Sequence, residues 1–132
     1  MKKELLVKSK IESLREVEKF IDLIAKEQHL DNNVYGNILI ATLEAANNAI
    51  IHGNKLDDQK EVFICLDIED KKIKLAVRDQ GPGFDFNNIP DPTAPENIEN
   101  ISGRGVFLMS KLSDSILFSE NGAAVELIFF LP

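Results

Sequence analysis

The chain has 132 residues, of which 44% are apolar, and this suffices for one domain with one ordinary core. Acidic residues outnumber basic ones by 22 to 15, and the net charge of −7 argues against nucleic acid or anionic membranes as partners. The favoured partner is a protein, or a small ligand whose charge a metal neutralises. No stretch has the apolar length of a signal peptide or a membrane span, so we expect a cytoplasmic protein.

The chain opens with the pattern of a strand followed by a helix. Residues 4–9 form a short β-prone run, which predicts an edge strand. Ser13 and Glu16 have the spacing of a capping box, and apolar residues at helical spacing continue to about residue 29. The first helix is therefore expected to be capped by Ser13.

A second helix is expected from about residue 34 to residue 51, with Asp31 or Asn32 at its start. Its residues are apolar or small on most faces, which predicts burial against a sheet. The tripeptide His-Gly-Asn at 52–54 should end it, because Gly and Asn readily adopt the left-handed conformation.

Strands and a long loop follow. Residues 61–68 and 72–77 alternate between apolar and polar, and the polar turn at 69–71 between them predicts a hairpin. Residues 80–103 concentrate Gly, Pro and Asn without a periodic pattern. A loop of this length inside one domain is typical of a functional lid or of local disorder.

The last elements are a third helix at about 103–112 and strands at 115–119 and 124–131, with a turn at Asn121-Gly122. The whole order is strand, two helices, two strands, loop, helix, two strands. It predicts an α+β two-layer sandwich, in which a mixed and mostly antiparallel sheet carries helices on one face. We expect residues 1–132 to form this single domain.

The second helix carries the first polar motif. Glu44 and Asn48 lie four residues apart, so they project from the same face of an otherwise apolar helix. An Asn carbonyl is a hard oxygen ligand suited to Mg²⁺, and a carboxylate one turn away can deprotonate an attacking hydroxyl. The alternative is structural, with Glu44 paired to a lysine and Asn48 capping a loop. These two residues alone leave both interpretations open.

The second motif is Asp79-x-Gly81-x-Gly83, directly after a predicted strand. An aspartate at a strand end can accept a hydrogen bond from an exocyclic amine such as that of adenine. The glycines allow the backbone to approach a flat ring. As a bare pattern this one is weak, because glycines after a strand often only form a turn.

The third motif is Gly103-Arg104-Gly105, at the start of the third predicted helix. Free backbone N–H groups and the helix dipole favour phosphate there, and Arg104 adds a positive charge. No Walker phosphate loop occurs in the sequence, and no glycine-rich strand-to-helix turn of the Rossmann type precedes the first helix.

In order and spacing, the three motifs resemble the N, G1 and G2 boxes of the GHKL ATPases, whose domain is the Bergerat ATP-binding fold. The run from Glu44 to Gly53 is similar to the N-box helix of the anti-sigma-factor serine/threonine kinases within that superfamily. Histidine kinases usually carry a basic residue three positions after the N-box Asn, where this chain has Ile51.

The resemblance implies a role for each site residue. Glu44 would be the catalytic base, and Asn48 would bind Mg²⁺. Asp79 would recognise adenine, and the loop at about 82–103 would be the ATP lid. Gly81 and Gly83 would shape the base pocket, and the remaining motif residues, Gly103, Arg104 and Gly105, would meet the phosphates.

One departure from the family concerns a Gly-Thr pair whose Thr supports the adenine-binding Asp. Here Gly122 is followed by Ala123 and Ala124, so that hydroxyl is absent.

The implied function is an ATP-dependent serine/threonine kinase that sequesters a sigma factor or other regulator and phosphorylates an antagonist protein in a bacterial partner-switching pathway. The resemblance also implies a homodimer. An alternative is a nucleotide-dependent protein-binding module without kinase activity, and a third is an α/β domain without a ligand.

Overall fold

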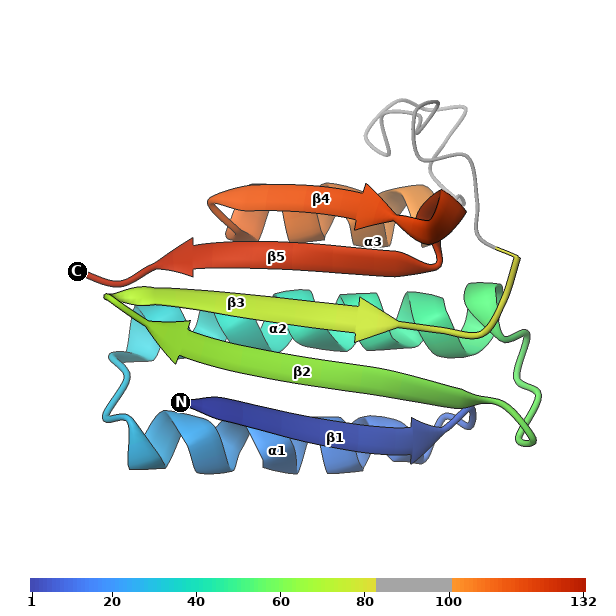
Figure 1. Ribbon diagram of the computed structural model, residues 1–132, viewed down its shortest axis with the longest axis horizontal. Coiled ribbons are helices and arrows are strands. Elements are labelled where there is room, and N and C mark those ends of the chain that lie inside the picture. The colour runs from blue at the N-terminus through green and yellow to red at the C-terminus, as the bar shows by residue number, and fades with distance from the viewer. Residues whose placement is uncertain (83–100) are drawn as a thin grey trace.

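Alternating apolar residues build five strands, which form one sheet (Figure 1). The computed structural model describes residues 1–82 and 101–132. The order across the sheet is β1-β2-β3-β5-β4, and each neighbouring pair is antiparallel. The strands are β1 (Lys2–Lys8), β2 (Glu61–Glu69), β3 (Lys72–Arg78), β4 (Ser115–Ser119) and β5 (Ala124–Phe130).

Three helices, α1 (Ser13–Glu27), α2 (Asn32–Asn48) and α3 (Ile101–Leu112), lie on one face of this sheet (Figure 1). α2 occupies the middle position and contacts both other helices. The predicted two-layer α+β sandwich is confirmed. The sheet was expected to be mixed, but it is antiparallel at each pair of strands in the described residues. None of the helices in these residues is long and apolar enough to cross a membrane.

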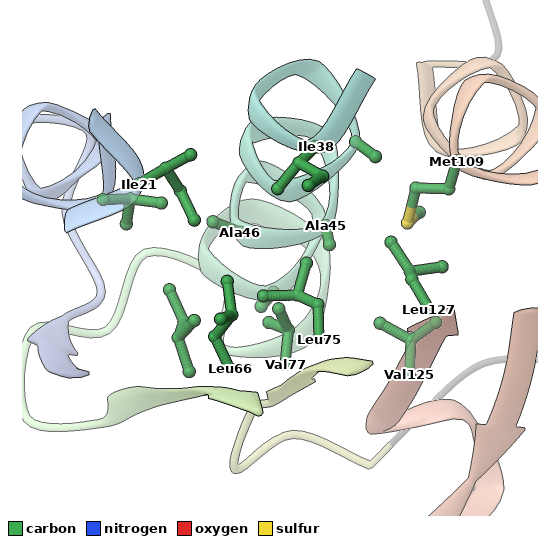
Figure 2. Close-up of a cluster of buried hydrophobic side chains, with 14 of the residues drawn as sticks. Ile21, Ile38, Ala45, Ala46, Leu66, Leu75, Val77, Met109, Val125 and Leu127 are labelled. Carbon is green, nitrogen blue, oxygen red and sulfur yellow. The ribbon is translucent and has the colours of Figure 1, made fainter. Parts of the chain in front are cut away.

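The core lies between the sheet and the helices (Figure 2). Leu66, Leu75 and Leu127 point from the central strands toward the helices and are almost fully buried. Ile38 of α2 and Met109 of α3 cover them from the other side. Burying each of these side chains contributes about 1.5–3 kcal/mol, so the core anchors α2 and α3 firmly against the sheet.

The predicted capping box at the start of α1 is wrong. The N-cap position is Glu12, without a side-chain cap, and Ser13 is the first residue of the helix. The Ser13 hydroxyl donates to the Lys8 carbonyl at 2.7 Å instead. Ser13 is fully buried where β1 leads into α1, and a main-chain acceptor at that junction is within its reach.

The start of α2 follows the prediction, but its end differs. Asp31 caps the helix, since its side chain accepts from two backbone N–H groups of the first turn. At the other end, α2 passes into one π-helical turn, Ala49–Gly53, and the Asn54 N–H donates to the Ala49 carbonyl at 2.8 Å. Asn54 is right-handed, with φ −87°, and the left-handed residues are the two that follow, Lys55 and Leu56.

Candidate nucleotide-binding site

The predicted N-box pair meets the start of α3. Glu44 and Asn48 are partly buried on α2, and Gly105 of α3 lies directly against them. A Cβ atom added at Gly105 would lie 3.0 Å from Asn48 Nδ2 and 3.1 Å from Glu44 Oε2. None of the ion pairs in residues 1–82 and 101–132 includes Glu44, so the lysine partner of the structural alternative is not found there.

Asn48 has a buried carbonyl oxygen, Oδ1, that accepts no hydrogen bond within the described part of the chain. A buried acceptor without a partner costs about 1–3 kcal/mol, which is tolerated mainly where a ligand completes the site. The described residues include no cluster of three or more His, Cys, Asp or Glu side chains able to hold a metal. Mg²⁺ nevertheless suits a single hard oxygen, because it usually retains waters and takes phosphate oxygens as its other ligands.

Asp79 follows β3 directly and is held on both sides. Its N–H donates to the Ala123 carbonyl at 2.9 Å, because the β3–β5 register ends at the pair Arg78 and Ala124. One carboxylate oxygen, Oδ1, accepts from the Gly81 N–H at 2.7 Å. The other, Oδ2, has no hydrogen bond within residues 1–82 and 101–132. Asp79 therefore presents one available acceptor atom.

The electrostatic setting of Asp79 disfavours its charged form. Burial raises the pKa of this carboxyl above its ordinary value, and the charge of Glu120 raises it further. The Gly81 hydrogen bond and the positive charge of Lys60 act in the opposite direction and only partly offset the burial.

Two glycines allow the loop after β3 to touch the end of α2. A Cβ at Gly81 would lie 1.9 Å from the Gly53 carbonyl oxygen, which is backbone and cannot move aside as a side chain can. A Cβ at Gly53 would lie 2.3 Å from Asp79 Cγ. Glycine is therefore required at position 81, because the Gly53 carbonyl oxygen leaves no room for a Cβ atom. Gly53, which the sequence marked only as part of a helix stop, belongs to the same contact.

A pocket joins these features. Its walls are mostly apolar, with a few polar groups, Asp79 and Asn48 among them, as is usual for small-molecule sites. Figure 2 labels lining residues on the core side of α2, β3, α3 and β5, namely Ala45, Val77, Met109 and Val125. The lining residues are Ala45, Asn48, Ala49, His52, Gly53, Val77, Asp79, Val106, Met109, Phe118, Gly122, Ala123 and Val125.

The structure describes some of the predicted site residues fully and others only in part. The structure brings Glu44, Asn48 and Gly105 together and places Asp79 on the pocket that Asn48 also lines. Gly103 and Arg104 lie in the first turn of α3, and their side chains are not described. Gly83 and residues 83–100 of the predicted lid at 82–103 lie outside the described residues.

The comparison with protein families agrees with this arrangement. The sequence model of the histidine kinase-like ATPase domain matches residues 7–129. The chain belongs to this family. The match spans nearly all of the described strands and helices, so the histidine kinase-like ATPase domain accounts for the whole fold, and the resemblance to GHKL ATPases is confirmed.

Curated relatives of this ATPase domain are named serine-protein kinase RsbW. The one from Staphylococcus epidermidis is 32% identical over 100 residues, covering 70% of this chain and 63% of that protein. The one from Bacillus licheniformis is 30% identical over 102 residues, covering 72% and 64%. The chain therefore spans slightly less than two thirds of the length of these relatives.

A solved structure shows the same fold. The crystal structure of the RsbU and RsbW domains of a Mycobacterium tuberculosis protein superposes with a TM-score of 0.71. The match covers 99% of this chain and 32% of that one, at 17% sequence identity.

Proposed function

We propose that this ATPase domain binds Mg-ATP and transfers the γ-phosphate to a serine or threonine of another protein. The observation that carries the proposal is the pocket shared by Asp79 and Asn48, with Glu44 one helical turn before Asn48. One recognition atom and one unpaired hard oxygen thus lie on the wall of a single pocket, and the Glu44 carboxylate lies one helical turn from the second of them. Phosphoryl transfer requires this combination of positioning and charge stabilisation.

Each site residue has a role in this proposal. Asp79 Oδ2 accepts from the exocyclic amine of adenine, and Gly81 and Gly83 leave room for the ring. Asn48 Oδ1 holds Mg²⁺, which neutralises phosphate charge when bound. Gly103, in the first turn of α3, offers its backbone N–H to the phosphates, where the helix dipole favours negative charge, and Gly105 in the next turn allows close approach to Asn48 and Glu44. Arg104 adds a positive charge there.

Glu44 is the proposed general base. It accepts the proton of the substrate hydroxyl, the hydroxyl oxygen forms a bond to the γ-phosphorus, and the bond from that phosphorus to the β–γ bridging oxygen breaks. ADP leaves with the electron pair of the broken bond. Glu44 lies one turn before Asn48 on the same face of α2, so it is close to the residue that would hold the metal.

The biological role follows from the relatives' name and the resemblance of the N-box helix. We infer an anti-sigma-factor-like kinase that sequesters a sigma factor or other regulator, acts as a homodimer and phosphorylates an antagonist protein. The relatives called serine-protein kinase support this, although the chain spans only 63% of their length. The cytoplasmic location stays a prediction.

The deciding experiment incubates the protein with γ-labelled ATP and candidate antagonist proteins. Transfer to a serine or threonine of the antagonist is expected for the wild type and not for Glu44→Gln. Equal absence of transfer in both, with ATP bound, would reject the kinase and leave the second candidate.

That second candidate is a nucleotide-dependent binding module without transfer. It is favoured by one observation, the methyl-bearing Ala123 on the pocket wall where the family commonly carries a threonine. Complex formation with the partner would then require ATP, and Glu44→Gln would bind the partner as well as the wild type does.

A further inference from the structure

Asn54 is a polar side chain buried in full, with only 1% of its surface exposed. Its amide is nearly saturated with hydrogen bonds. Nδ2 donates to Ser9 Oγ at 2.6 Å and to the Glu61 carbonyl at 3.1 Å. Oδ1 accepts from the Gln80 N–H at 2.7 Å. One side chain thus joins the ends of β1 and α2, the start of β2 and the loop after β3.

The bond to Gln80 matters because Gln80 follows Asp79 directly. The N–H before the Asp79 Cα is held by the Ala123 carbonyl, and the N–H after it is held by Asn54. The Gln80 side chain adds a further tie, since its Oε1 accepts from the Glu61 N–H at 2.7 Å. The peptide groups on both sides of Asp79 are therefore fixed, one by β5 and one by Asn54.

We propose that Asn54 is a positioning residue for base recognition: it fixes the direction in which the Asp79 carboxylate faces the pocket. This inference rests on the proposed function, since it assumes that Asp79 accepts from adenine. Without Asn54 the Gln80 N–H loses its acceptor, and the peptide group between Asp79 and Gln80 loses the one hydrogen bond that holds it directly. Only the Asp79 N–H and side-chain bonds of Asp79 and Gln80 then restrain its direction. A displacement of the carboxylate by about 1 Å would weaken a directional hydrogen bond but not the apolar contacts of the base.

Asn54 also lies one residue after Gly53, whose carbonyl oxygen touches Gly81. It therefore connects α2, which carries Asn48, to the loop that carries Asp79. The buried amide of Asn54 and the contact between Gly53 and Gly81 thus join the segment of the proposed metal ligand to that of the proposed base-recognition carboxylate.

The test measures the affinity for ATP and for inosine triphosphate, which carries a carbonyl in place of the adenine amine. Asn54→Leu keeps the branched shape and removes every hydrogen bond. Asn54→Asp keeps an oxygen acceptor for Gln80. The matched control is Ser9→Ala, because Ser9 is also fully buried and bonds Asn54, but its hydrogen bonds within the described residues go to Asn54 and Lys60 and not to residues 79–82.

The wild type should bind ATP more tightly than inosine triphosphate. In Asn54→Leu the ratio of the two affinities should fall about tenfold, which is the effect expected for the loss of one hydrogen bond to a charged group. Asn54→Asp should retain the preference. Ser9→Ala should lower the melting temperature and leave the ratio unchanged, because a loss of stability affects both ligands equally. An unchanged ratio in Asn54→Leu, or the same loss in Ser9→Ala, would overturn the inference.

The two levels of the proposal remain separable. If the wild type binds no nucleotide, the proposed function is rejected and this inference with it. If the wild type prefers ATP and Asn54→Leu has the same ratio of affinities for ATP and inosine triphosphate, only the inference is rejected. If Asn54→Leu does not fold, amide exchange in the unaltered protein decides. The Gln80 N–H should be protected from exchange as strongly as the Asp79 N–H before ATP is added, and a Gln80 N–H that exchanges as fast as an exposed amide would overturn the role of Asn54.

Discussion

Gly105 of α3 lies so close to Asn48 of α2 that an added Cβ would approach the Asn48 side-chain nitrogen to 3.0 Å and its oxygen to 3.2 Å. The two helices therefore meet at the atom that we assign to Mg²⁺. Two residues 57 positions apart in the chain form this contact because α2 and α3 lie side by side on the sheet.

Gly105→Ala should weaken Mg-ATP binding about tenfold while leaving the fold intact. The added methyl group meets the mobile ends of Asn48 and Glu44 rather than backbone, and alanine favours the helix by about 1 kcal/mol over glycine. Titrating the variant with ATP, once in the presence of Mg²⁺ and once in the presence of EDTA, checks this. A variant that binds Mg-ATP normally would show that Gly105 does not border the metal.

Asn48→Ala should weaken ATP binding mainly when Mg²⁺ is present, because its Oδ1 is the proposed ligand. Asp79→Ala should weaken binding with or without metal, since it acts on the base. Calorimetry of both variants in both conditions separates these roles. Equal losses for the two variants in the two conditions would contradict the assignment.

Asp79→Asn should reverse the base preference. The Gly81 N–H retains the side-chain oxygen, so the new nitrogen takes the place of Oδ2 and can donate but not accept. We expect a loss of about tenfold or more for ATP and a gain for inosine triphosphate, whose carbonyl accepts from that nitrogen. Retained preference for ATP would show that Oδ2 is not the recognition atom.

The same substitution should stabilise the nucleotide-free protein at neutral pH. The pKa of Asp79 is raised by burial, so the folded protein binds this proton more readily than the unfolded chain does. Stability therefore falls as pH rises from the ordinary value of 3.8 through the raised value, and the cost persists above it. Melting curves of the wild type and Asp79→Asn should diverge as pH rises through this window, and parallel curves would contradict the shift.

Gly81→Ala should destabilise the fold by about 1–3 kcal/mol, the usual cost of overpacking, because its Cβ meets the Gly53 backbone. Gly36→Ala on α2 is the matched control, since nothing lies within 4 Å of its Cβ, and it should stabilise the protein slightly. Urea unfolding measures both. A neutral Gly81→Ala would mean that the contact between this loop and the end of α2 relaxes freely.

The parts of the fold that depend on local periodicity could be predicted from the sequence. The spacing of Glu44 and Asn48 puts both on one helix face, and the alternation in β3 places Asp79 at a strand end. The pocket wall at Ala123 could not be found in this way, because it depends on β5 pairing with β3, and that order is not visible in a single sequence.

Asn54 and Ser13 show what local sequence patterns do not predict. Both were interpreted by local rules, as a helix stop and a helix cap, and both are buried donors that bond residues outside the helix concerned. The contacts of Asn54 lie 45, 7 and 26 residues away, so no pattern in its own neighbourhood could indicate them.

The π-helical turn at Ala49–Gly53 amounts to one residue more than an α-helix would hold there. The wider turn takes up this extra residue within itself, so the residues after it keep the facing that they would have in a continuous α-helix. A chain one residue shorter at this point would close an ordinary α-helical turn and still bring Gly53 and Asn54 to the loop after β3. An inserted residue and an altered helix direction are therefore separate events here, and the two halves of the site can stay aligned in homologues of either length.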